Sequence, residues 1–257
     1  MRSTDMTYAW KDAGEEWSEP WGSSAAQWAG AILPRIRQCL PAETILEIAP
    51  GFGRWTHYLK DYCRSLWIVD PSVECIEACR RRFAADSRIR CFVNDGRSLS
   101  MLPDDSIDFV FSFDSFVHLE REIVEAYLSE LANKLKLGGK GFIHHSNFGE
   151  YADSLDERLP CWVKRLLMKA HILDWSHQRN ARMTADVFRG MCRQHGLHCL
   201  SQELVNWRGR RLIDCFSIFV RSDAPLGEST RIIRNRQFMR EAARIRAQAH
   251  VRSNKQQ

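Results

Sequence analysis

Five polar residues that could do chemistry stand where predicted strands end. They are Asp70, Asp95, Asp114, His144 and His145. Carboxylates and imidazoles are the side chains that most often accept protons or hold polar ligands. In an open sheet with helices on both faces, ligands bind at the carboxyl ends of the strands. The sequence therefore predicts one polar site at one edge of a sheet.

A turn with two glycines, Gly51 and Gly53, joins the apolar run 45–48 to an amphipathic segment, 57–63. Glycine lets the backbone approach a ligand closely, and the following helix offers free amide donors at its start. Asp70 follows Gly51 by nineteen residues. An acid at about 20 residues accepts ribose hydroxyls in nucleotide-binding βαβ units. A glycine turn alone could be structural, but the two signals together predict a cofactor site.

Strands and helices alternate along the chain. We expect strands at 45–48, 65–70, 89–94, 106–114 and 141–145, and helices at 57–63, 72–84, 121–135 and 184–195, with Gly138 and Gly139 capping the third helix. The β-rich runs 200–207 and 212–221 predict a hairpin. This rhythm is typical of an α/β protein with a doubly wound parallel sheet.

Three parts are expected: a Trp-rich N-terminal arm or lid (1–40), a main domain (41–222) with a helical insertion at 148–182, and a basic C-terminal helix or tail (223–257). A helix at 24–40, which Pro34 could kink, belongs to the arm, and a helix at 161–173 to the insertion. The tryptophans of the arm, Trp10, Trp17, Trp21 and Trp28, are too much apolar surface to leave in water. They either pack on the body or form a lid over a ligand.

The composition favours a cytoplasmic protein without a membrane span. The chain has 257 residues, 44% of them hydrophobic, and no apolar run approaches the ~18 residues of a membrane span. The nine cysteines lack CxxC pairs, which favours free thiols over disulfides or zinc. The net charge is only +5, so the arginines of the last thirty residues are interpreted as a solvated helix or tail. A nucleic acid partner is not favoured, and a homodimer stays open.

Several motifs in combination resemble class I S-adenosylmethionine-dependent methyltransferases over about residues 40–220. They are Glu47-x-Ala49-x-Gly51-x-Gly53, Asp70, Asp95-Gly96, Asp108-Phe109-Val110-Phe111 and Leu137-Gly138-Gly139-Lys140-Gly141. The resemblance implies a Rossmann-like sheet of seven strands, the last one antiparallel. It also implies that Glu47 and the turn from Ala49 to Gly53 hold the methionine part of the cofactor. Asp70 would take the ribose hydroxyls, Asp95 and Gly96 would lie by the adenine, and Phe113 would also contact the cofactor.

Within that class, the segments 48–54, 112–118 and 144–149 are similar to glycan and sugar O-methyltransferases, including those of methylmannose polysaccharide synthesis. The resemblance implies that the acceptor is a hydroxyl group of a sugar or an oligosaccharide.

Methyl transfer to a sugar hydroxyl benefits from a base or a metal that lowers the pKa of the hydroxyl. His144 and His145 must point to opposite faces of the sheet, so one of them reaches the acceptor, and His144 is the favoured base. Asp114, His118 and Glu120 predict a magnesium site, with loop capping and a solvated helix start as the alternative.

Three other functions stay open at this level. One is O- or N-methylation of a small natural product, and a second is a cofactor-binding subunit without catalysis. A nicotinamide dehydrogenase is less consistent, because Trp55 and Thr56 stand where the Rossmann pattern has its third glycine.

Overall fold

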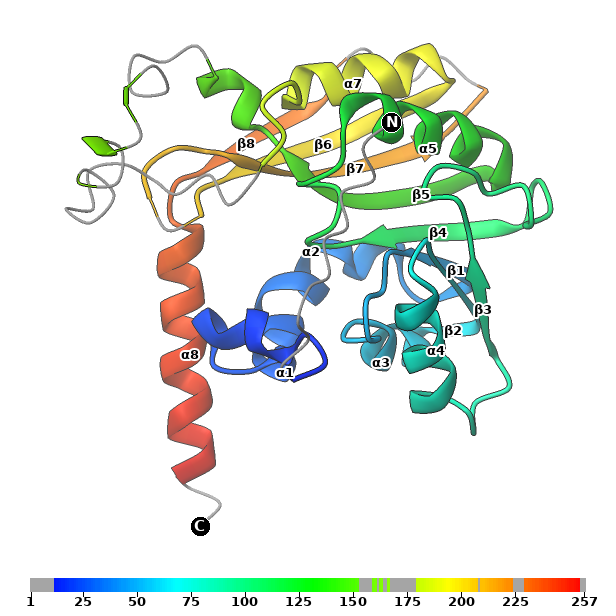
Figure 1. Ribbon diagram of the computed structural model, residues 1–257, viewed down its shortest axis with the longest axis horizontal. Coiled ribbons are helices and arrows are strands. Elements are labelled where there is room, and N and C mark those ends of the chain that lie inside the picture. The colour runs from blue at the N-terminus through cyan, green and yellow to red at the C-terminus, as the bar shows by residue number, and fades with distance from the viewer. Residues whose placement is uncertain are drawn as a thin grey trace.

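The computed structural model describes residues 12–152, 159–160, 162–163, 166, 179–207, 209–223 and 229–254. These residues form one sheet of eight strands in the order β3-β2-β1-β4-β5-β7-β6-β8 (Figure 1). The strands are β1 (Ala42–Ile48), β2 (Cys63–Asp70), β3 (Ile89–Val93), β4 (Ile107–Ser112), β5 (Leu135–Ser146), β6 (Leu197–Val205), β7 (Asp214–Arg221) and β8 (Arg231–Asn235).

The predicted doubly wound sheet is confirmed. Strands β1 to β5 are mutually parallel where they pair, and β7 runs antiparallel to both β5 and β6. The first seven strands are thus those that the motifs implied, with β6 and β7 as the hairpin. Strand β8 extends the sheet by pairing parallel with residues 201–205 of β6. It lies in the segment interpreted from the sequence as a helix or tail.

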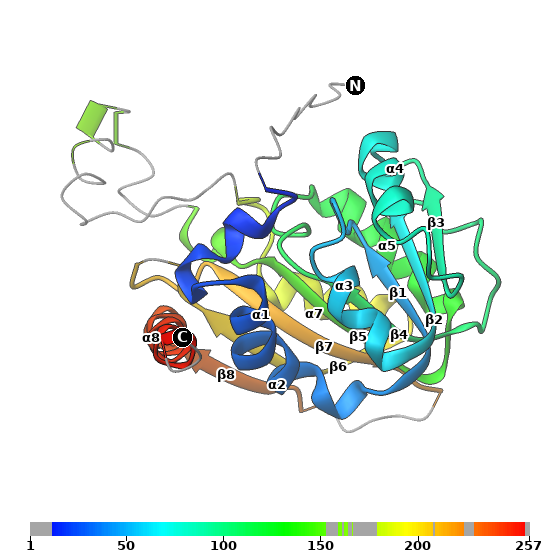
Figure 2. The ribbon, with the colours of Figure 1, turned by 90° about the horizontal axis from the view of Figure 1, so that it is seen from below.

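Helices cover both faces of this sheet (Figure 2). They are α1 (Ser24–Gln27), a π-helical segment (Trp28–Ile32), α2 (Leu33–Ile36), α3 (Thr56–Leu59), α4 (Val73–Arg82), α5 (Arg121–Lys134), α7 (Ala185–Gln194) and α8 (Phe238–Asn254), with 3-10 turns at Glu15–Trp21, Arg37–Cys39, Lys60–Tyr62 and Phe148–Tyr151. One core cluster joins α5 and α7 to the sheet. The other joins the N-terminal arm, α3, α4 and α8 to the opposite face.

The prediction that Gly138 and Gly139 cap a helix is wrong. Helix α5 ends at Lys134, and the chain passes directly into β5 at Leu135. Residue Leu135 already pairs with Ile107 of β4, and the register shifts after that pair. A Cβ on Gly139 would stand 2.8 Å from the carbonyl oxygen of Lys136. The two glycines therefore lie in an irregularity inside a strand, where Gly138 has a positive φ of 80° and neighbouring backbone leaves no room for a side chain at Gly139.

The N-terminal arm packs against the body through its tryptophans. Trp21 is fully buried, with ring centroids 5.5 Å from Trp207 and 5.7 Å from Phe238 of α8. Trp28 stacks on Tyr58 at 5.3 Å. The packing alternative thus holds for these two tryptophans.

Two predicted features fall wholly or mainly outside the described residues: Trp10, and the helix at 161–173 within the insertion. Among the helices that are described, none has the length and apolarity needed to cross a membrane.

Replacing Gly141 of β5 by alanine should destabilise the protein by about 1–3 kcal/mol, the usual cost of overpacking a core. A Cβ at this position would overlap the ring of Phe219, which is fully buried and cannot move into solvent. Urea unfolding measures the change. Gly190→Ala is the matched control, since a Cβ at Gly190 of α7 would meet open space. Equal stability of the two variants would contradict the overlap.

Candidate functional site

The turn after β1 has an unusual backbone. Ala49, Gly51 and Gly53 all have positive φ angles, 58°, 58° and 82°. At Gly53 an added Cβ would stand 2.5 Å from Cε2 of Phe83 and 3.3 Å from Sγ of Cys79. Glycine is thus required here for its conformation and for space, and the strained Ala49 beside it is a mark of functional turns. The turn leads into α3 and forms a backbone cradle.

Glu47 lies in β1 beneath this turn and is fully buried, so burial raises its pKa to about 8. The hydroxyl of Thr56 donates to its Oε2 at 2.5 Å, and this bond together with the charge of Arg54 offsets part of the rise. At neutral pH the carboxyl group is therefore mostly protonated. A cation bound beside it would favour the ionised form.

Asp70 and Asp95 end neighbouring strands but differ in environment. Burial raises the pKa of Asp70 to about 6, although the backbone amides of Ser72 and Gly51 stabilise its carboxylate. Asp95 is exposed and accepts hydrogen bonds from the amides of Arg97 and Ser98, which lower its pKa. Asp95 therefore closes a local turn, and its predicted place beside the adenine stays a prediction. The role of Gly96 (φ 81°) beside a ligand stays a prediction.

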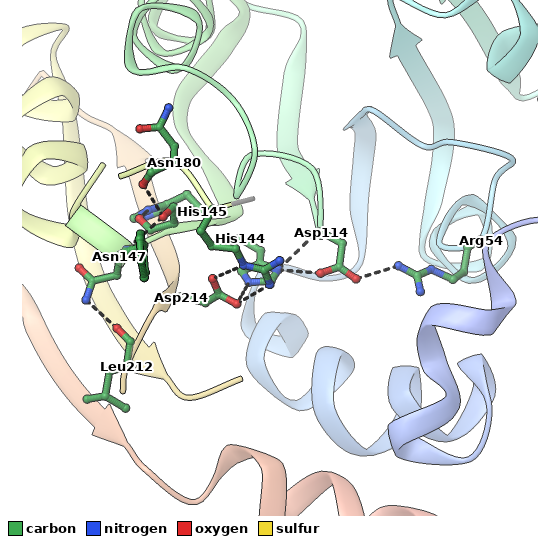
Figure 3. Close-up of polar contacts among 11 residues, drawn as sticks. Arg54, Asp114, His144, His145, Asn147, Asn180, Leu212 and Asp214 are labelled. Atoms are coloured by element: carbon green, nitrogen blue, oxygen red, sulfur yellow. Dashed lines mark hydrogen bonds and ion pairs between the residues drawn. The ribbon is translucent and has the colours of Figure 1, made fainter. Parts of the chain in front are cut away.

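A chain of charged groups crosses the carboxyl ends of β4 and β5 (Figure 3). Nη2 of Arg54 lies 3.1 Å from Oδ2 of Asp114, and Oδ1 of Asp114 lies 3.5 Å from Nδ1 of His144. On the other side of the imidazole, Nε2 lies 3.4 Å from Oδ2 of Asp214. Arg179 completes the chain, donating from Nε to Oδ1 of Asp214 at 3.0 Å and from Nη2 to Oδ2 at 2.8 Å.

Asp214, Arg179 and Arg54 were not among the predicted site residues. Asp214 opens β7, the antiparallel neighbour of β5, so it reaches His144 from the adjacent strand on the same face of the sheet. One signal was present in the sequence, since Asp214 is a charge within the apolar run Leu212 to Phe216. Burial by itself would raise the pKa of Asp214, but Arg179 and His144 hold it below its usual range.

Asp114 is the part of this chain that solvent reaches. Its side chain is 21% exposed, whereas the side chain of His144 is 0% exposed. Asp114 has a φ of 68°, which is strained for a residue with a side chain, and its amide donates to Nδ1 of His144 at 3.2 Å. The strained turn thus places the amide and the carboxylate of Asp114 against the same ring.

Aromatic rings enclose His144. Its ring centroid lies 4.7 Å from that of Phe113, 4.8 Å from Phe216 and 5.8 Å from Trp207. Phe113 also contacts Trp55 beside the glycine turn, at 5.6 Å. Phe113 therefore connects the turn with His144, while its predicted contact with a cofactor stays a prediction.

His145 points to the opposite face, as the strand alternation predicts. Its Nδ1 lies 2.9 Å from the carbonyl oxygen of Ser146, and its Nε2 lies 2.8 Å from Oγ of Ser217. The ring stacks on Phe188 of α7 at 4.0 Å, and burial lowers its pKa to about 3. Since both nitrogens are engaged beneath a helix, the geometry does not support the prediction of His145 as a catalytic residue.

The predicted magnesium ligands do not come together. In the described part of the chain, no three His, Cys, Asp or Glu residues form a group that could hold a metal ion. Asp114 pairs with Arg54 and His144 instead. His118 is exposed, and Glu120 is the N-cap residue of α5, with its carbonyl accepting the amide of Val124. The prediction of Asp114, His118 and Glu120 as a metal site is thus not supported, because the donor set does not fit.

Asn147 holds two further segments against the end of β5. Its Nδ2 donates to the carbonyl of Leu212 at 2.8 Å, and its Oδ1 accepts the amide of Ala185 at 2.7 Å. Next to it, the hydroxyl of Ser146 donates to the carbonyl of Asn180 at 2.8 Å. These bonds fix the segments that carry Asp214 and Arg179, and Figure 3 draws those to Leu212 and Asn180.

Replacing Glu47 by glutamine should change how stability depends on pH. The folded-state pKa of Glu47, about 8, lies above the ordinary value near 4.3. The tendency of this carboxyl group to ionise therefore does not lower the free energy of unfolding at low pH, but lowers it increasingly as pH rises towards 8. We expect Glu47→Gln to be more stable than the parent at pH 8 and about equally stable at pH 4.5, as measured by thermal melting. Parallel pH profiles of the two proteins would contradict the raised pKa.

Comparison with known proteins gives the family context. Residues 45–139 match the family model described as a methyltransferase domain. No curated protein sequence matches the chain.

Solved structures with a similar fold come from several organisms. A protein from Pyrococcus horikoshii has a TM-score of 0.57 and 19% identity, covering 77% of this chain and 91% of that one. A chain from the complex between the Haloferax volcanii Trm112 methyltransferase activator and a methyltransferase has a TM-score of 0.55 and 19% identity. The match covers 85% of this chain and 100% of that one. A third structure is the geranyl diphosphate C-methyltransferase of Streptomyces coelicolor A3(2) in complex with Mg²⁺, geranyl diphosphate and S-adenosyl-L-homocysteine. It has a TM-score of 0.54 and 14% identity, and the match covers 75% of this chain and 80% of that one. At these identities the likeness concerns the fold.

Proposed function

We propose that this chain is an S-adenosylmethionine-dependent methyltransferase and that it methylates a hydroxyl group of a sugar-type small molecule. The observation that carries the proposal is the Asp114 and His144 pair. It lies at the carboxyl ends of β4 and β5, and Arg54 ties it to the glycine turn. The proposed proton acceptor and the glycine turn thus share one edge of the sheet.

The residues of the turn fit the cofactor. The cradle at Ala49, Gly51 and Gly53 leaves no room for a side chain at Gly53, and Glu47 beneath it is a buried acid that a nearby cation would ionise. Asp70, held by two amides at the end of β2, would accept the ribose hydroxyls. When bound, the cofactor supplies a methyl group carried on a sulfonium cation.

The Asp114 and His144 pair would take up the proton of the acceptor. A sugar hydroxyl is a poor nucleophile at neutral pH and gains from a base, whereas a free amine needs none. The pair, its flanking arginines and Asp214 carry no net charge when the imidazole is neutral, because two arginines balance two carboxylates. A proton that passes to the imidazole would therefore lie between the carboxylates of Asp114 and Asp214.

The resemblance of segments 48–54, 112–118 and 144–149 to sugar O-methyltransferases supports a sugar acceptor. Small-molecule acceptors of other kinds are the competing assignment, since the similar Streptomyces coelicolor enzyme is named for geranyl diphosphate.

A direct screen tests this proposal. The protein is titrated with S-adenosylmethionine by calorimetry and then assayed for methyl transfer to mannosides, glucosides, phenols and amines, each with and without a chelator. We expect cofactor binding, transfer to a glycoside hydroxyl and no effect of the chelator. Transfer to amines alone would overturn the hydroxyl proposal. Tight cofactor binding without transfer to any acceptor would favour a non-catalytic subunit.

A further inference from the structure

We infer that Asp214 is a positioning residue, which holds the proton of His144 on Nε2 so that Nδ1 faces Asp114 as a proton acceptor. The inference rests on the proposed function, because it concerns the imidazole of the proposed base. It starts from the two ring nitrogens of His144, whose neighbours differ in kind.

The neighbour of Nδ1 is a donor. The backbone amide of Asp114 points its hydrogen at this nitrogen across 3.2 Å, so Nδ1 must present a lone pair. In a neutral imidazole the proton then resides on Nε2. That nitrogen is completely buried and lacks a well-aligned hydrogen bond within the described residues, and its polar neighbour is Oδ2 of Asp214 at 3.4 Å. A carboxylate only accepts, so it favours the same tautomer.

The position of Asp214 is fixed by pairing and by charge. In the antiparallel pairing of β5 with β7, His144 stands opposite Phe216, and Asp214 is two residues earlier on the same face. Its two carboxylate oxygens accept from two nitrogens of Arg179, whose guanidinium carbon lies 5.4 Å from the Trp207 ring centroid. A fork-to-carboxylate pair of this kind holds the acid in one orientation.

Loss of the carboxylate should therefore release the ring. In Asp214→Asn the side chain offers an amide in place of one oxygen, so Nε2 can meet a donor and the proton can move to Nδ1. The imidazole would then already carry its proton on Nδ1 and could no longer accept one on the side of Asp114.

The first test is spectroscopic and needs no acceptor. Nitrogen-15 NMR of the histidine side chains reports which ring nitrogen of His144 carries the proton, with His144→Gln used to assign the signal. We expect the Nε2 tautomer in the parent protein and a mixed or Nδ1 tautomer in Asp214→Asn. The Nδ1 tautomer in the parent protein, or an unchanged tautomer in the variant, would overturn the inference.

The second test is kinetic. Asp214→Asn should lower kcat by roughly 10²–10⁴-fold, the range of general-base effects, with KM and cofactor Kd unchanged. His144→Ala combined with Asp214→Asn should lose no more than His144→Ala alone, because both changes disable one unit. Wild-type kcat in Asp214→Asn would overturn the inference if His144→Ala is inactive. An active His144→Ala would instead sink the proposed base, while the NMR test of Asp214 stands.

Asp108→Asn is the matched control. Asp108 also accepts from a cation, Lys136, and from a backbone amide, that of Thr44, but it lies near the opposite end of β4. It should keep the parent tautomer and kcat. If Asp214→Asn does not fold, as judged by circular dichroism and cofactor binding, Arg179→Lys is used instead, since it keeps the charge but loses the two-pronged hold. That variant should show the same loss of tautomer preference in a weaker form, and an unshifted tautomer would count against the inference.

Discussion

Replacing His144 by alanine is expected to lower kcat by about 10²–10⁴-fold without weakening cofactor binding. The imidazole is the group in the charged chain that can gain a proton between two carboxylates, Asp114 and Asp214. It does not belong to the glycine turn, so the affinity for the cofactor should be retained. Stopped assays with the acceptor found by the screen measure kcat, and calorimetry measures the cofactor Kd.

His118→Ala is the control for this experiment. His118 is exposed in the same segment between β4 and α5, and the structure does not group it with Asp114 and Glu120 as a metal site. Its replacement should leave kcat near the parent value. The reverse result, loss in His118→Ala and full activity in His144→Ala, would restore the magnesium prediction and remove the proposed base.

Replacing Arg179 by methionine is expected to destabilise the fold by roughly 3–5 kcal/mol at pH 7, the cost of leaving one member of a buried ion pair unpaired. Asp214 is fully buried, and Arg179 supplies two of its hydrogen bonds. Urea unfolding gives the difference. Arg182→Met is the control, because Arg182 pairs with Glu122 in solvent, where such pairs contribute about 0–1 kcal/mol.

The pH dependence of that loss distinguishes its cause. In the parent protein the pKa of Asp214 is depressed, so its contribution to stability is present above the unfolded pKa, about 3.9, and falls away at lower pH. In Arg179→Met, burial without a cation raises the pKa of Asp214. Asp214 then becomes protonated as pH falls, and the variant regains part of its lost stability. The gap between the two proteins should therefore narrow from pH 7 to pH 4. A constant gap would show that lost packing on Trp207, and not charge, is responsible.

Strand and helix patterns in the sequence predicted the order of the central elements correctly, because hydrophobic periodicity is local. The glycine turn and Asp70 were also recognisable from spacing alone, since one βαβ unit is short and its geometry is nearly fixed. For the same reason the opposite orientations of His144 and His145 followed directly from strand alternation.

The partners of each histidine needed the tertiary structure. Asp214 lies seventy residues beyond His144 and meets it only through the pairing of β5 with β7, a register that no local pattern contains. Sequence proximity suggested Asp114, His118 and Glu120 as one metal site, but the strained turn at Asp114 directs its carboxylate towards Arg54 and His144.

In the C-terminal segment too, a helix could be predicted from the sequence, whereas a strand that depends on a distant partner could not. Its arginines indicated a solvated helix, and α8 is present, with Arg240 and Arg244 exposed. Strand β8 was missed, because a five-residue segment with arginines at 231 and 234 becomes a strand only beside β6. The sequence by itself thus determined the fold class and the glycine turn, whose signals lie within short stretches of chain. Only the tertiary structure decided which charged groups surround His144, because contacts between distant strands depend on their register in the sheet.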